Sequence, residues 1–289
     1  MRATNQTTVN RHQVATPLRP RASGAVALGG MALHAGVHTS VVLVRRPGPI
    51  AFCQHGYEAC LDELRVARVD RGVAVQDQVI FVDLCEHLLS AVGGLGIDSG
   101  LRIDVFGCEL PLLDGGAFRF ARCLRQLGWT SQSRRRRIVK EAEIEVANSL
   151  YRFRPGPGVY LSVEVVFEHE LIATTHACWH GDADDYLKRI APARTFGFRR
   201  EAEQLMVAGR ARGIDFRSVV VLEDDGTSLS SPPPVKDECV RHKLLDLIGD
   251  LTLDGGVPEG IIEAYRPGHG ATHAALDMAK VEGVFEAMG

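Results

Sequence analysis

The sequence predicts an α+β fold of two similar halves, packed as a two-layer sandwich with the helices between the sheets. Each half runs through strands to a helix with a histidine near its start, and then through a strand to a further helix. Glu86-His87-Leu88-Leu89 also aligns with Arg241-His242-Lys243-Leu244, and the same shift places Gly94 on Gly249. This faint internal repeat indicates that the two histidine-bearing helices face each other across a site between the halves.

The first half is expected to span residues 25–129, after a polar tail over residues 1–24 that contains arginines but no acidic residue. We interpret the tail as a flexible end ahead of the first strand, with a transit peptide as the alternative. The elements predicted in this half are strands at 25–28 and 39–44, a helix at 82–92, a strand at 101–106 and a helix at 118–127. Gly93, Gly94 and Gly96 are expected to end the first helix.

The second half is expected to span residues 138–289, after a basic linker at 130–137 that includes four consecutive arginines. A turn at 154–158, rich in proline and glycine, separates two predicted strands. The remaining expectations are strands at 138–146, 159–167, 218–222 and 261–265, and helices beginning at 184–190 and spanning 237–251 and 273–288.

Composition excludes several classes of function. The chain has 289 residues, 45% of them hydrophobic and 24% charged, and its net charge of −3 offers no electrostatic case for nucleic acid. No apolar run approaches the ~18 residues that cross a bilayer. The seven cysteines are scattered and never spaced as C-x-x-C, which indicates neither a disulfide framework nor a cysteine-rich zinc site. We therefore expect a cytoplasmic monomer without a membrane-spanning segment.

The helix predicted at 237–251 carries three polar side chains on one face. His242, Asp246 and Asp250 recur every four residues, so they are stacked along the helix, and an imidazole and a carboxylate one turn apart can reach a single ion. A catalytic zinc site needs such ligands and leaves one position open for water. Taken alone the pattern is weak, because a His and an Asp at this spacing more often form a surface hydrogen bond.

Three further segments carry candidate chemistry. A carboxylate beside a ligand histidine, as in Glu86-His87, can reach a metal-bound water, although a helix N-terminus also favours a glutamate. His269 lies between two glycines, where backbone can approach a ligand, and Asp250 is a suitable partner for its ring; a loop histidine without a role fits equally. The segment 193–198 contains Thr195 and two phenylalanines, and a packed strand end explains it as well.

Taken in order, these segments resemble the UDP-3-O-acyl-N-acetylglucosamine deacetylases of the lipid A pathway. The resemblance runs from about residue 25 to the C-terminus. It rests on Gly30-Met31-Ala32-Leu33-His34-Ala35-Gly36, Glu86-His87-Leu88-Leu89-Ser90-Ala91, Gly94-Leu95-Gly96-Ile97-Asp98, Pro111-Leu112-Leu113-Asp114-Gly115, Ala193-Arg194-Thr195-Phe196-Gly197-Phe198, residues 240–251 and Gly268-His269.

The resemblance implies a zinc-dependent hydrolase that takes acetate from a sugar nucleotide carrying an acyl chain, in the cytoplasm of a Gram-negative bacterium. It implies that His87, His242 and Asp246 bind Zn²⁺, with Fe²⁺ as an alternative for such a ligand set. Glu86 is implied as the general base and His269 as the general acid or electrostatic stabiliser. Asp250 would orient His269, and Thr195 would stabilise the oxyanion. Phe196, Phe198 and Lys243 are implied to contact the substrate.

Some segments depart from the family pattern. Where the family has Leu-x-Leu-Gly-Gly-Ser along the passage for the acyl chain, this sequence has Arg210-Ala211-Arg212-Gly213-Ile214-Asp215, which we expect to narrow that passage. Residues 82–85 lack the customary threonine, and Glu170 replaces a proline. Three hypotheses follow: the deacetylase itself, the same chemistry on a shorter or more polar acyl amino sugar, and a catalytically silent protein that binds a sugar nucleotide.

Overall fold

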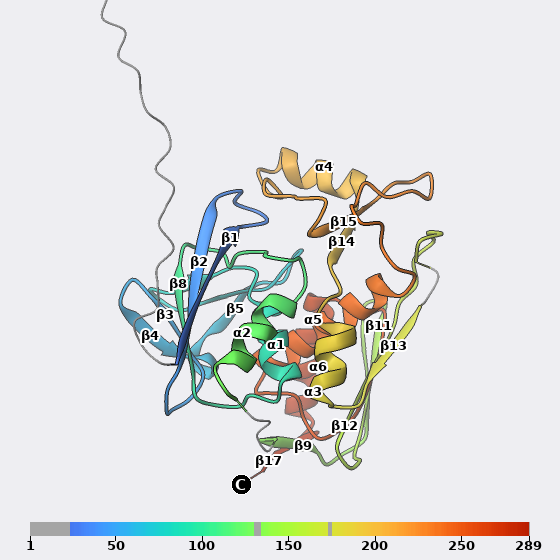
Figure 1. Cartoon of the computed structure of the whole chain (residues 1–289). Coiled ribbons are helices and arrows are strands. Elements are labelled where there is room, and N and C mark those ends of the chain that lie inside the picture. Colours follow the sequence, from blue (N-terminus) through green and yellow to red (C-terminus); the bar gives the residue numbers. More distant parts are fainter. Residues whose placement is uncertain (1–23, 130–133, 173–174, 289) are drawn as a thin grey trace, which may run out of the picture.

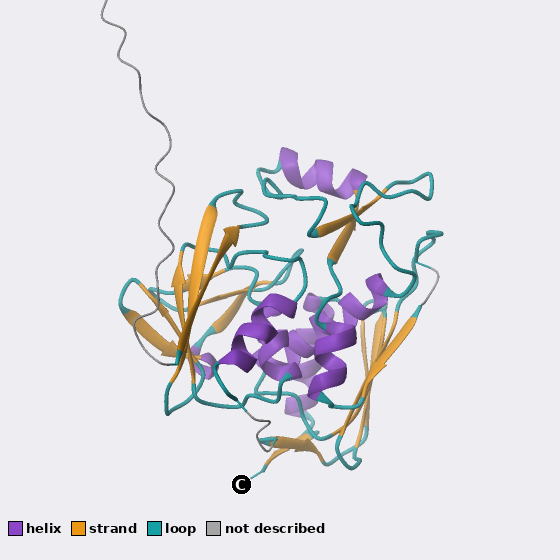
Figure 2. Cartoon of the chain, viewed as in Figure 1, coloured by secondary structure: helices purple, strands orange, loops and turns teal. Residues whose placement is uncertain are grey.

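Two five-stranded sheets form the outer layers of the molecule, and helices fill the space between them (Figures 1 and 2). The structure, a computed structural model, describes residues 24–129, 134–172 and 175–288. The predicted tail up to residue 23 and residues 130–133 of the predicted linker lie outside these ranges. The arrangement confirms the predicted α+β sandwich with its helices between the sheets.

The two sheets have the same topology. The first has the order β1 (Ala25–Met31), β2 (His38–Arg45), β8 (Leu101–Phe106), β3 (Ala51–Gln54) and β4 (Tyr57–Cys60). The second has the order β10 (Ala142–Val146), β11 (Ser149–Arg154), β16 (Gly260–Tyr265), β12 (Val159–Glu164) and β13 (His176–Trp179). Neighbouring strands in both sheets pair antiparallel, antiparallel, parallel and antiparallel. The faint repeat in the sequence therefore corresponds to a structural duplication.

Two of the helices between the sheets bury all of their apolar side chains. The helical segments are α1 (Glu86–Gly94), α2 (Phe118–Gln126), α3 (Ala183–Asp185), α4 (Arg199–Val207), α5 (Glu238–Leu253) and α6 (His269–Val281), with a π-helical turn at Tyr186–Ile190 and a 3-10 turn at Leu61–Glu63. Every residue of α1 is buried, and α5 is buried over most of its length. Only α4 lies outside this layer, at the top of Figure 1.

Each half also inserts a small sheet ahead of its histidine-bearing helix. The first insertion is an antiparallel sheet of β5 (Arg65–Arg68), β6 (Ala74–Gln76) and β7 (Phe81–Val82). The second pairs β14 (Thr195–Phe198) in parallel with β15 (Val219–Leu222), with α4 between them in the chain. A last pair joins β9 (Arg136–Ile138) to β17 (Phe285–Ala287).

Helices α1 and α5 pack closely because glycines stand at their contact. A Cβ added to Gly249 would meet the backbone of Glu86, and one added to Gly93 would meet the side chain of Thr252. Any larger side chain at these positions would push the helices apart. This contact therefore fixes the start of α1 relative to α5, which is where the candidate ligands lie.

Two predicted helices have different bounds in the structure. The helix predicted at 82–92 begins at Glu86, because Val82 belongs to β7 and Leu84 has a φ of 56°. Of the glycines expected to end it, Gly93 lies inside it, Gly94 is its last residue, and Gly96 follows it with a φ of 66°. The closing helix predicted at 273–288 spans His269–Val281, and the chain turns at Gly283, where φ is 69°, before β17.

The second half also contains elements that the sequence analysis did not predict. The strand predicted at 138–146 is divided between β9 and β10, and a tight hairpin at Ala147, with a φ of 52°, leads into the unpredicted strand β11. Arg136 and Arg137, placed in the linker, belong to β9. Helix α4 was also missed, because its charged residues show no continuous apolar face.

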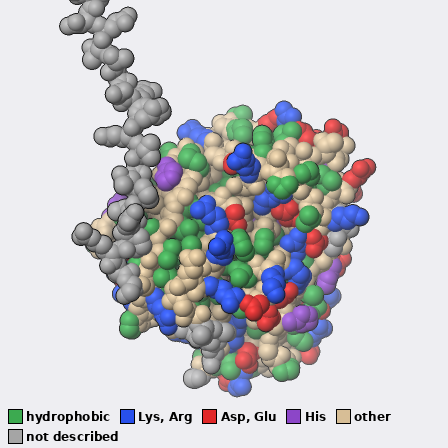
Figure 3. Space-filling model, viewed as in Figure 1, with side chains coloured by type: hydrophobic (Ala, Val, Ile, Leu, Met, Phe, Trp, Pro, Cys, Tyr) green, Lys and Arg blue, Asp and Glu red, His purple; other side chains and the backbone are tan. Residues whose placement is uncertain are grey.

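Charges of both signs lie next to one another across the face shown in Figure 3. Many of them are paired, as in the exposed ion pairs of Arg199 with Glu203 and Arg152 with Glu143. Among the described residues, no helix combines the length and the apolar character needed to cross a membrane.

Candidate active site

Two histidines and one carboxylate converge between the halves. His87 lies on the first turn of α1, and His242 and Asp246 lie one turn apart on α5. One potential ligand atom from each of the three lies within 4.8 Å of the others, and all three residues are buried. His242 Nε2 is 3.4 Å from Asp246 Oδ1, and the two imidazole rings meet edge to face. A divalent cation needs such a cluster of N and O donors.

The hydrogen bonding of these side chains fits a cation. His242 Nδ1 lies 3.0 Å from the Ala193 carbonyl, to which it donates, so its Nε2 is left as an acceptor. His87 Nδ1 is buried without a hydrogen-bond partner among the described residues. Burial, followed by the effect of His242, lowers the pKa of His87 to about 3, so its ring is neutral. Neutral imidazoles beside a carboxylate can bind a metal without first losing protons.

Glu86 lies beside this cluster as the first residue of α1. Its side chain is buried and accepts a hydrogen bond of 2.9 Å at Oε2 from the backbone N–H of Val73, on the segment leading into β6. Burial raises the pKa of Glu86 to about 7, because the charged carboxylate loses its hydration. The group can therefore exchange a proton near neutral pH.

His269 lies across the cluster at the start of α6. Its Nδ1 donates to both oxygens of Asp250, at 2.9 and 3.1 Å, and its Nε2 is 3.9 Å from Asp246 Oδ2. Burial disfavours the charged ring, but the carboxylates of Asp250 and Asp246 outweigh it and raise the pKa of His269 to about 9. His269 is thus protonated at neutral pH, with Nε2 directed at the cluster.

Aromatic side chains and a lysine lie next to the cluster. The Phe196 ring is 6.2 Å from that of His242, and Phe167 contacts both Phe196 and Phe198. Lys243 Nζ donates to Asp246 Oδ2 at 2.7 Å. These groups provide flat apolar faces and a positive charge within one short stretch of surface.

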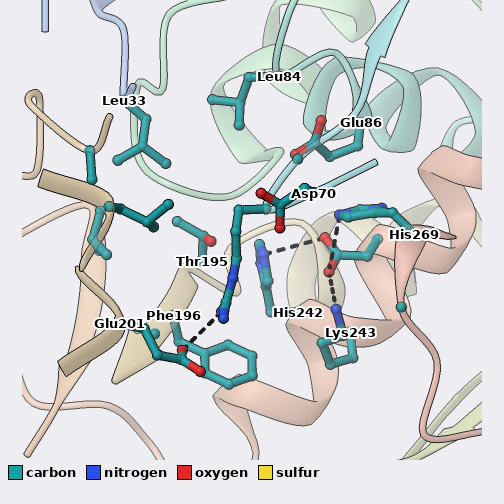
Figure 4. A pocket seen from close by; sticks show the side chains of 18 of the residues that line it. Leu33, Asp70, Leu84, Glu86, Thr195, Phe196, Glu201, His242, Lys243 and His269 are labelled. Atoms are coloured by element: carbon teal, nitrogen blue, oxygen red, sulfur yellow. Dashed lines mark hydrogen bonds and ion pairs between the residues drawn. The ribbon is translucent and has the colours of Figure 1, made fainter. Parts of the chain in front are cut away.

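One cavity of about 440 Å³ connects all these groups. Figure 4 shows Leu33 and Leu84 on one side of it and Phe196 and Glu201 on the opposite side. Leu33, Leu84, Ile214, Val219 and Val221 pack on one another and make the part farther from the histidines apolar. The cavity therefore has a polar end and an apolar end.

Comparison with known proteins gives the family. The model of the UDP-3-O-acyl N-acetylglycosamine deacetylase family matches residues 22–279. The chain belongs to this family. Its relatives named UDP-3-O-acyl-N-acetylglucosamine deacetylase in Brucella melitensis, Brucella ovis and Brucella abortus are each 32% identical over 255 residues, which cover 85% of this chain and 89% of the relative.

In this member of the deacetylase family, the site residues predicted from the sequence come together. Nine of the ten line the cavity, namely Glu86, His87, Thr195, Phe196, Phe198, His242, Lys243, Asp246 and His269. Asp250 lies behind His269 and contacts its ring.

The segment 210–215, which was expected to narrow the passage for the acyl chain, lines the cavity only in part. Ile214 and Ala211 line the cavity, whereas Arg210 is directed at Asp70. Among the charged residues that line the cavity, Asp70, Arg71 and Glu201 were not predicted. Arg71 and Glu201 are 130 positions apart in the chain, on elements that the sequence analysis missed, so no local pattern connects them.

Proposed function

We propose that this chain is a zinc-dependent amide hydrolase that removes acetate from UDP-3-O-acyl-N-acetylglucosamine in lipid A biosynthesis. The observation that carries the proposal is the convergence of His87, His242 and Asp246 with Glu86 and His269 in one cavity. The family and the names of the relatives support the substrate. Fe²⁺ is an alternative occupant, because a two-histidine, one-carboxylate set accepts either ion.

The reaction replaces the amide C–N bond of the acetamide with a C–O bond from water. A Zn²⁺ ion held by the three ligands would polarise the carbonyl and make the attacking water more acidic. Glu86 accepts a proton from that water as its oxygen adds to the carbonyl carbon. The hydroxyl of Thr195 is suited to donate to the carbonyl oxygen as negative charge develops there.

The amine must leave with a proton. His269 donates it from Nε2, while Asp250 holds the ring and its charge in place. The proton on Glu86 then reprotonates His269, or it passes to the amine directly. The net change consumes one water and gives acetate and the 2-amino sugar nucleotide.

The remaining groups are suited to the rest of the substrate. Phe196 and Phe198 offer rings to the sugar and the base, and Lys243 offers a charge to the phosphates. The apolar end of the cavity fits an acyl chain.

The seven cysteines are all free thiols, as in a reducing compartment, so we infer that the reaction takes place in the cytoplasm.

Two variants test the proposal. Glu86→Ala should keep stoichiometric zinc and lose most acetate release, since the group removed accepts a proton and binds no ion. Asp246→Ala should lose zinc, because one ligand is missing. Metal analysis and acetate release are measured on samples that unfold cooperatively. Normal turnover by Glu86→Ala would rule out Glu86 as the group that accepts the proton from water. Stoichiometric zinc without acetate release from any UDP-acyl amino sugar would instead identify a silent sugar-nucleotide-binding protein.

A further inference from the structure

Two ion pairs join the insertions of the two halves beside the cavity. Arg71, in the loop between β5 and β6, donates from Nη1 to Oε2 of Glu201 on α4 at 2.9 Å. Its neighbour Asp70 accepts from Arg210, which follows α4, at Oδ2 and at the backbone carbonyl, both at 3.0 Å. The loop of the first half is thus tied to the second half at two adjacent positions.

The first of these pairs is part of the cavity wall. Arg71 and Glu201 line the cavity together with Leu33, Leu84 and Ile214, and a dashed line in Figure 4 marks the pair at Glu201. The side chains of Arg71 and Glu201 remain 46% and 28% exposed, so water reaches both charges. An acyl chain that runs from the histidines to the apolar side chains of the same cavity therefore passes a wall that contains a hydrated ion pair.

A long alkyl chain would change the surroundings of this pair. Packing methylenes against it would remove water from both charges, which costs free energy that the attraction within the pair does not fully return. Displacing the pair would break the contact between the insertions. A short acyl group reduces both costs, because it fills less of the cavity and covers less of the pair.

The second pair holds the first in place. Arg210 is 19% exposed, and its Nη2 also lies 3.0 Å from Nε2 of His34. Its Nε is buried without a partner among the described residues, so the side chain has little freedom to turn toward solvent. Because Asp70 directly precedes Arg71, this contact fixes the backbone at Arg71. The φ of Arg71 is 55°.

We propose that the Arg71–Glu201 pair, held by Arg210 and Asp70, limits the acyl group of the substrate to short chains. The inference rests on the proposed function and specifies its substrate: a UDP-N-acetylglucosamine with a short 3-O-acyl group. It also explains how Arg210 acts without lining the cavity, namely by fixing the loop that supplies Arg71.

The test compares butyryl, octanoyl and myristoyl substrates of otherwise identical structure. The wild-type protein should show a kcat/KM for the butyryl substrate at least about tenfold above that for the myristoyl substrate, about 1.4 kcal/mol. The double variant Arg71→Leu, Glu201→Leu should shift this ratio toward the long chain by about tenfold. The exchanged pair Arg71→Glu, Glu201→Arg should restore the wild-type ratio, because it restores the charges.

A matched control comes from the same helix. Arg199 forms an ion pair with Glu203 outside the cavity wall, so Arg199→Leu should leave the ratio between chain lengths as in the wild type. A wild-type protein that handles myristoyl and butyryl substrates equally well would overturn the proposal. So would a ratio that the double leucine variant leaves unchanged.

Failure of the proposed function is distinguishable from failure of this inference. If no substrate releases acetate, the same series is titrated calorimetrically into the wild type and the double leucine variant. Dissociation constants that rise with chain length only in the wild type would support the chain-length limit even then. Equal constants for all lengths in both proteins would refute it.

Discussion

Ionisable side chains around the cavity have pKa values shifted in opposite directions. Burial raises the pKa of Glu86 to about 7 and lowers that of His87 to about 3. His269 is buried to a similar degree, but the carboxylates of Asp250 and Asp246 raise its pKa to about 9. One cavity thus holds a carboxylate that can take a proton, a neutral imidazole and a charged imidazolium, which suits acid–base chemistry at neutral pH.

These shifts predict a bell-shaped pH dependence of kcat/KM for the zinc-loaded protein. Activity should rise as Glu86 loses its proton and fall as His269 loses its own. A cation nearby favours the deprotonated form of both, so the limbs should lie at or below about pH 7 and about pH 9. His269→Gln should lower kcat/KM by about 10²–10⁴-fold and remove the basic limb. A basic limb that persists in this variant would show that another group donates the proton.

The relative positions of site residues could be predicted from the sequence where those residues lie close together in the chain. His242, Asp246 and Asp250 share one helix face, so their stacking follows from helical geometry alone. His87 and His269 were assigned to the site through the family resemblance. Arg71 could not be placed, because its partner Glu201 lies on an insertion whose position depends on tertiary packing.

Among the elements, α1 and α5 determine the geometry of the site through their close contact. Gly249→Ala would place a methyl group against the backbone of Glu86 and displace the turn that also carries His87. We expect a loss of about 1–3 kcal/mol in stability, as for other overpacked contacts. Zinc affinity and turnover should fall as well. Zinc affinity is measured by competition with a chelator, and turnover is measured by acetate release. Unchanged zinc affinity would show that the glycine serves packing alone.

The side chain of Arg136 caps the end of α5, away from the site, and its removal can be compared with Gly249→Ala. Arg136 in β9 donates to the carbonyls of Leu251, Asp254 and Gly256 at the end of α5, and it pairs with the buried Asp254 carboxylate at 3.1 Å. Arg136→Ala should lower the free energy of unfolding by about 3 kcal/mol, because the carbonyls at the end of α5 lose their donor and the buried Asp254 carboxylate keeps only Lys280 as its cation.

Its neighbour provides the control. Arg137 pairs with Glu286 at the surface, where both side chains are about half exposed, so Arg137→Ala should cost less than about 1 kcal/mol. Urea unfolding separates the two. Equal losses would contradict the assignment of Arg136 as the cap of α5. The folded Arg136→Ala protein should bind zinc as tightly as the wild type, in contrast to Gly249→Ala.

Long elements with a repeated apolar pattern could be predicted, whereas several short strands could not. Helix α5 was predicted within two residues at each end, because its leucines recur at helical spacing. Strands β3, β4 and β13 contain four residues each, and their place in a sheet depends on partners far along the chain. Helix α1 ends at Gly94, as its glycines predicted, but the close contact of Gly93 with Thr252 and of Gly94 with Tyr186 could not be predicted.

At the scale of the whole molecule, the duplication explains why the site lies between the halves. Each half has the same sheet topology and presents its histidine-bearing helix to the other. The first half contributes Glu86 and His87, and the second contributes His242, Asp246 and His269. The sequence indicated this only through a short alignment around the two histidines. The identical strand order could not be predicted, since two of the five strands of each sheet were not predicted.

A metal ion that joins α1 to α5 should also stabilise the fold, because its ligands are in place only when the halves are packed together. Zinc at a hundredfold excess over its dissociation constant should add about 2.7 kcal/mol to the free energy of unfolding, and a chelator should remove that increment. The Tm of the chelated wild type should then rise with added zinc. Asp246→Asn should show no such rise, whereas Glu86→Ala should retain it. A Tm that zinc leaves unchanged in the wild type, at concentrations that support activity, would contradict a ligand set that is in place only in the folded protein.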